Sequence, residues 1–92
     1  MIYVPYTSQL FEENGQIVAV CQELSVSSFG DTPEAALASL QEAVTLFLEE
    51  CHRMATLETV LEEAGYCRDT GNPQRWLRRR LIATAEREAA VA

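Results

Sequence analysis

Hydrophobic and polar residues alternate at the start of the chain, in a pattern typical of a β-strand with one buried face. We expect this strand over residues 2–12. Pro5 would place it at an edge of its sheet or fray its start, because proline has no N–H to donate to a neighbouring strand. Its predicted buried positions recur every second residue and are Ile2, Val4, Tyr6 and Leu10.

Two further strands are expected after a tight turn. Asn14-Gly15 are the residues that most readily adopt the positive φ of a type I′ turn, so they predict a hairpin. The apolar run at residues 17–21 is its second strand. Residues 26–29 are β-prone and predict a third strand, which Gly30 ends by allowing a sharp exit of the chain.

A long amphipathic helix is predicted from residue 33 to about Arg53. Thr32 can cap its first turn, Pro33 suits the first helical position, and Glu34 complements the positive end of the helix dipole. Apolar residues at steps of three and four form one face: Ala36, Leu37, Leu40, Val44, Phe47, Leu48 and Cys51. The other face is largely acidic and contains Glu34, Gln41, Glu42, Glu49 and Glu50.

A short second helix is predicted at residues 57–64, capped by Thr56 and stopped by Gly65. Tyr66 and Cys67 should then turn toward the core. Residues 69–73 (Asp-Thr-Gly-Asn-Pro) contain many turn formers and predict an exposed loop. The composition of residues 75–92 favours a helix, although alternation in residues 81–86 also permits a strand.

Length and charge narrow the possible functions. The 92 residues fit one domain, 1–92, whose basic C-terminal segment is 68–92. Residues 1–67 contain 11 acidic side chains and only Arg53 as a base, which gives a net charge of −10; residues 68–92 contain six arginines and three acids, which gives +3. An acidic body repels nucleic-acid backbones and attracts a basic protein.

The cysteines and the apolar runs indicate a cytoplasmic protein. Cys21, Cys51 and Cys67 form an odd set, and residues 1–15 lack the basic start and apolar stretch of a secretory signal. We therefore expect reduced thiols in a cytoplasm. No apolar run approaches the roughly 20 residues that span a bilayer, so we expect no membrane insertion.

No residue pattern predicts catalysis, a cofactor or a metal site. Cys51-His52 could be combined with Cys21 and Cys67, but no Cys-x-x-Cys or His-x₃-His pair is present, and adjacent helical residues point apart. Asp31 and Asp69 are the only aspartates, and most glutamates lie on predicted solvent-facing helix sides. We therefore expect a protein that is not an enzyme and uses no cofactor.

The segment Arg75-Trp76-Leu77-Arg78-Arg79-Arg80 has two interpretations. Arginines with an interleaved aromatic could hold phosphates and stack on bases, as in a small nucleic-acid-binding protein. Alternatively, Trp76 packs on the core or at a subunit contact, beside a solvated arginine-rich turn. The sequence leaves both interpretations open.

Most of the chain resembles the HicB-like antitoxin family. The resemblance lies in Cys21-Gln22-Glu23-Leu24, followed by Gly30-Asp31-Thr32-Pro33-Glu34-Ala35-Ala36-Leu37, which is similar to the Gly-Asp-Thr helix entry of that family. The segment Leu57 to Tyr66 is similar to a second helix of its compact members. Gln22, Ser25 and Val26 stand where the family usually has Pro, Pro and Gly. The 25 or so residues after Cys67 are too few for an appended helix-turn-helix module.

The resemblance implies an α+β fold: an antiparallel sheet of three to four strands with helices on one face, in the order β-β-β-α-α-β. It also implies a final strand at about residues 81–91. The implied function is that of a type II antitoxin that occludes a small basic HicA-like mRNA-cleaving toxin. An orphan protein-interaction module is an alternative. A short sheet with open edges further predicts a homodimer or higher homo-oligomer.

Overall fold

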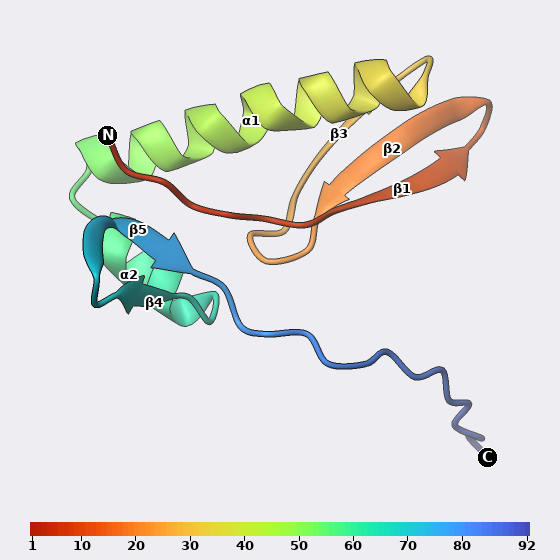
Figure 1. Ribbon diagram of the computed structural model, residues 1–92. Helices are drawn as coiled ribbons and strands as arrows, with labels where there is room; N and C mark the ends of the chain where they lie inside the picture. Colours follow the sequence, from red (N-terminus) through yellow and green to blue (C-terminus); the bar gives the residue numbers. More distant parts are fainter.

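The computed structural model describes all 92 residues and has an α+β architecture (Figure 1). A three-stranded antiparallel sheet is followed by two helices and a two-stranded sheet. This confirms the expected fold class. The elements are β1 (Ser8–Glu13), β2 (Gln16–Cys21), β3 (Val26–Gly30), α1 (Pro33–Arg53), α2 (Leu57–Glu63), β4 (Cys67–Asp69) and β5 (Asn72–Leu77).

The β1–β2 hairpin forms as the sequence predicts. Asn14 and Gly15 have φ values of 51° and 80°, the two positive angles that a type I′ turn requires. Strand β2 lies in the centre of the sheet, between β1 and β3. Helix α1 packs across β2 and β3 on one face of this sheet, and no helix covers the opposite face (Figure 1).

Helix α1 begins and ends where the sequence predicts. The Thr32 hydroxyl accepts a hydrogen bond from the Ala35 N–H at 3.1 Å, which satisfies one free donor of the first turn. Gly30 ends β3 as expected; it lies opposite Ile17 and has no positive φ. Its role is close packing, since a Cβ at this position would lie 2.7 Å from the Ala36 backbone nitrogen.

Two groups of buried side chains form the core. The first lies between the sheet and α1 and contains Ala19, Cys21, Ala36, Leu40 and Val44. The second lies where α2 and β5 meet the end of α1 and contains Cys51, Leu57, Leu61, Tyr66 and Trp76. Leu24 and Leu48 pack against both groups, so the two parts of the core are continuous.

The first strand is shorter than the sequence predicts, and its N-terminal part has a different partner. Tyr3 pairs with Arg75 in a parallel bridge: the Tyr3 N–H donates to the Gln74 carbonyl at 2.8 Å, and the Trp76 N–H donates to the Tyr3 carbonyl at 2.9 Å. Ile2 and Leu10 are exposed, contrary to expectation, because α1 lies over β2 and β3 and not over this edge.

The predicted caps around α2 are only partly correct. Gly65 follows the helix with φ of 94°, as a C′ glycine should. Thr56 makes no side-chain cap, because its hydroxyl donates to the Cys51 carbonyl at 3.2 Å. Tyr66 is buried as expected. The prediction for Cys67 is wrong, because this side chain is exposed on strand β4.

The predicted final strand at residues 81–91 is wrong. Residues 78–92 form neither helix nor strand, and the last strand is β5, closer to the core. Trp76 explains the position of β5, because its side chain is only 2% exposed and buries a large apolar surface in the core. The side chains of residues 81–91, by contrast, are all exposed. The predicted loop at residues 69–73 is likewise a β4–β5 hairpin, whose turn is limited to residues 70–71.

Candidate protein-binding surface

A row of apolar side chains crosses the sheet on the face that α1 leaves open. Phe11 pairs with Val18, and Val18 pairs with Phe29, so the three side chains lie side by side across β1, β2 and β3. The alternation of side chains along each strand places them opposite Ala19, which is buried under α1. Phe11 is 48% exposed and Phe29 is 61% exposed. We call Phe11, Val18 and Phe29 the outer row.

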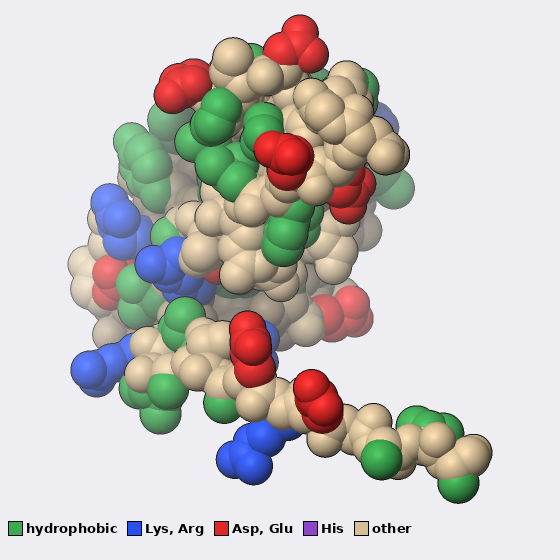
Figure 2. All heavy atoms as spheres, turned by 90° about the vertical axis from the view of Figure 1, so that its right-hand side faces the viewer, with side chains coloured by type: hydrophobic (Ala, Val, Ile, Leu, Met, Phe, Trp, Pro, Cys, Tyr) green, Lys and Arg blue, Asp and Glu red, His purple; other side chains and the backbone are tan.

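Acidic side chains accompany the outer row at one end of the molecule. Glu12 and Glu13 precede the hairpin turn, and Asp31 and Glu34 lie at the entry to α1. We call residues 78–92, which follow β5, the tail. Figure 2 looks onto this end, where acidic and hydrophobic side chains share the surface, and the arginines in view lie to one side and along the tail. A shallow hollow of about 430 Å³ is lined by Glu13, Asn14, Gln16, Val18, Ser27, Ser28 and Phe29.

Most carboxylates of the body are free of cationic partners. Three of the 11 in residues 1–67 form ion pairs: Glu23 with Arg78, Glu50 with Arg53, and Glu58 with Arg68. The eight others are exposed and have no basic group within 4.0 Å; they are Glu12, Glu13, Asp31, Glu34, Glu42, Glu49, Glu62 and Glu63. Their combined field attracts a basic partner and repels an acidic one.

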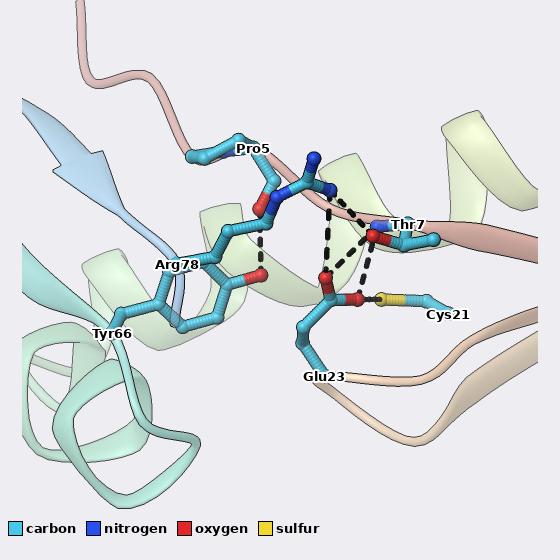
Figure 3. Close-up of polar contacts among 6 residues, drawn as sticks. All are labelled: Pro5, Thr7, Cys21, Glu23, Tyr66 and Arg78. Carbon is cyan, nitrogen blue, oxygen red and sulfur yellow. Dashed lines mark hydrogen bonds and ion pairs between the residues drawn. The ribbon is translucent and has the colours of Figure 1, made fainter. Parts of the chain in front are cut away.

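A polar cluster joins four segments that are distant in sequence, at the other end of the sheet (Figure 3). Both carboxylate oxygens of Glu23 accept from the Thr7 N–H at 3.0 Å, and Arg78 Nη1 lies 3.8 Å from Glu23 Oε2. Arg78 also donates to the Thr7 hydroxyl. The Tyr66 hydroxyl donates to the Pro5 carbonyl at 2.7 Å. These contacts join the N-terminal segment to the β2–β3 turn, to Tyr66 and to the start of the tail.

Burial, hydrogen bonds and nearby charges shift the pKa values of Glu23, Cys21 and Tyr66 in this cluster. Burial raises the pKa of the Glu23 carboxyl, but hydrogen bonds from Thr7 and the charge of Arg78 outweigh burial, so its pKa lies below the ordinary value. Burial and the neighbouring Glu23 carboxylate raise the pKa of the Cys21 thiol, which therefore stays protonated and donates to Glu23 at 3.8 Å. Burial likewise raises the pKa of Tyr66.

The depressed pKa of Glu23 predicts a pH dependence of stability. The stability that the ionised Glu23 carboxylate contributes is present above the unfolded-state pKa of 4.5. It is lost as pH falls through the lower, folded-state pKa. We expect Glu23→Gln to lower the free energy of unfolding by about 1–3 kcal/mol at pH 7, through loss of charge-assisted hydrogen bonds. The difference from wild type should shrink below pH 4.5.

Urea unfolding followed by circular dichroism between pH 3 and pH 7 measures this effect. The control is Glu62→Gln, because Glu62 is exposed and forms no ion pair. The free energy of unfolding of Glu62→Gln should equal that of the wild type at every pH. A Glu23→Gln deficit that does not change between pH 7 and pH 3 would show that the carboxylate charge contributes nothing.

The residues considered for metal binding do not converge. Cys21 and Cys51 are buried in different parts of the core, while His52 and Cys67 are exposed. No three side chains of the His, Cys, Asp and Glu types come together in metal-binding geometry. Asp69 accepts a hydrogen bond from the Gly71 N–H at 2.8 Å, which shapes the β4–β5 turn.

Several side chains of the arginine-rich segment, and the nearby Arg68, contact other residues of the same chain. Trp76 is buried and cannot stack on a base, which favours the interpretation of a core tryptophan. The Arg68 guanidinium lies 4.8 Å from the centre of the Trp76 ring, and that of Arg75 lies 5.5 Å from the centre of the Tyr3 ring. Arg78 belongs to the Glu23 cluster. Arg80 remains exposed without an ion pair.

Comparisons with protein-family models, with curated proteins and with solved structures found no match to this chain. Neither helix has the length and apolar composition needed to cross a membrane. The geometry of the chain itself is therefore the basis for a functional proposal.

Proposed function

We propose that this chain is a cytoplasmic HicB-like antitoxin, a binding protein that occludes a small basic HicA-like mRNA-cleaving toxin. The observation that carries the proposal is the exposed outer row on a body with eight unpaired carboxylates. The resemblance of residues 21–37 to HicB-like antitoxins adds the identity of the partner. The protein acts by binding and catalyses no reaction.

The outer row supplies the apolar centre that a protein interface needs. Aromatic side chains at the centre of an interface provide most of its binding energy, while polar residues at the rim exclude water. Phe11 and Phe29 are exposed aromatics on a rigid sheet, so they lose little conformational freedom on binding. A second copy is a poor occupant of this face, because the acidic residues of the two copies would repel each other.

The acidic surroundings supply selectivity for a toxin that handles RNA. A protein that binds an RNA backbone presents basic side chains, and carboxylates can pair with the same groups that hold phosphates. Binding of the antitoxin then excludes RNA by competition. Opposite charges also raise the rate of encounter, and this effect weakens as salt screens the charges.

The direct test is coexpression with the protein encoded beside this chain, which the proposal expects to be small and basic. We expect a stable complex that copurifies at 1:1 stoichiometry and in which the partner no longer cleaves RNA. Growth arrest caused by the partner alone should be relieved by coexpression. A neighbour that is not basic, or one whose RNA cleavage continues in the presence of excess antitoxin, would contradict the proposal.

A further inference from the structure

An apolar groove separates the N-terminal segment from α1. It has a volume of about 600 Å³, and most of its lining is hydrophobic, including Ile2, Val4, Val44, Leu48 and Leu57. It lies on the α1 side of the molecule and thus on the opposite side of the sheet from the outer row. One wall carries Gln41, Thr45, Glu49 and His52 at helical spacing, and the Glu49 carboxylate has no ion-pair partner.

The tail presents two adjacent apolar side chains that nothing in the chain covers. Leu81 is 77% exposed and Ile82 is 87% exposed. The preceding Arg80 is exposed and unpaired, whereas Arg79 lies against Gly65 of the body. The free part of the tail therefore begins with a basic residue and continues with an apolar pair, which complements the apolar groove and the Glu49 carboxylate at its wall.

The direction of the tail argues against binding of Leu81 and Ile82 in the groove of the same chain. From Arg78, which is held by Thr7 and Glu23, the tail runs away from α1 and from the N-terminal segment (Figure 1). Figure 2 likewise shows it projecting from the side of the molecule below the body. The apolar pair is thus carried away from the groove of its own chain.

We propose that the groove binds Leu81 and Ile82 from the tail of a second copy. Arg80 of each tail then pairs with Glu49 of the other chain. Because each copy contributes one tail and one groove, two copies related by a twofold axis satisfy both sites and form a closed dimer. The outer row lies on the other face of the sheet and remains free in this dimer. This inference does not depend on the proposed antitoxin function.

Sedimentation velocity and light scattering of the full chain test the proposal. We expect a dimer for the wild type and a monomer for the double variant Leu81→Asp, Ile82→Asp, with a dissociation constant raised at least tenfold. Val91→Asp is the control, because Val91 is another exposed apolar residue of the same tail; this variant should remain dimeric. A monomeric wild type at millimolar concentration, or a double variant that dimerises like Val91→Asp, would overturn the proposal.

A charge exchange tests the pairing of Arg80 with Glu49. Arg80→Glu and Glu49→Arg should each weaken the dimer, since each places like charges together. The combination of both substitutions in one chain should restore it. Both residues are exposed, so the single variants should keep the circular dichroism spectrum of the wild type. Single variants that dimerise like the wild type would contradict this orientation of the tail in the groove.

Discussion

Phe29→Asp is expected to weaken binding of the basic partner by about 100-fold while the protein keeps its fold. Phe29 is 61% exposed at the edge strand of the sheet, so the carboxylate that replaces it is solvated in the free protein. In the complex the same carboxylate would be buried against the apolar centre of the interface. The loss of affinity has two causes: the aromatic contact is missing, and the new charge must be removed from water.

The control for Phe29→Asp is Leu46→Asp. Leu46 is 58% exposed, but it lies on α1 and not in the outer row, so its substitution adds the same charge at a distant place. Isothermal titration calorimetry with the copurified partner should show unchanged affinity for this variant. Equal affinities for Phe29→Asp and Leu46→Asp would remove the outer row from the interface, even if the partner still bound elsewhere.

The first two thirds of the fold follow from local sequence signals. Asn14-Gly15 fixes the hairpin turn, and Thr32-Pro33 fixes the start of α1, because each pair satisfies a backbone requirement within a few residues. The C-terminal third depends on long-range contacts. The position of β5 is decided by the bridge between Tyr3 and Arg75 and by burial of Trp76, and neither leaves a local pattern that separates residues 72–77 from residues 81–91.

The candidate surface could be predicted only in part. The acidic charge of residues 1–67 is evident from composition, and the period of two along the strands implies that Phe11 faces away from Leu10. The row itself requires the register that places Phe11, Val18 and Phe29 side by side. The Glu23 cluster could not be predicted, because Thr7, Glu23 and Arg78 are brought together only by tertiary packing.

Gly30→Ala is expected to lower the free energy of unfolding by about 3 kcal/mol, near the upper end of the usual effect of overpacking. A Cβ at this position would lie 2.7 Å from the Ala36 nitrogen and 2.9 Å from the Ala35 carbonyl carbon. Both neighbours are backbone atoms of the first turn of α1, so relief requires the helix to move away from β3. That movement would loosen the packing of Ala36 and Leu40 in the core.

Urea unfolding of Gly30→Ala beside Gly71→Ala separates this clash from the general effect of replacing glycine. Gly71 has no positive φ, and the nearest atom to its added Cβ is the Asp69 Oδ1 at 3.4 Å, an ordinary contact. Its substitution should therefore change stability by no more than about 1 kcal/mol. If both variants unfolded at the same urea concentration, α1 would not press on β3 at Gly30. A selective loss would instead show that the absence of a side chain at Gly30 is needed to seat α1 on the sheet whose opposite face presents the outer row.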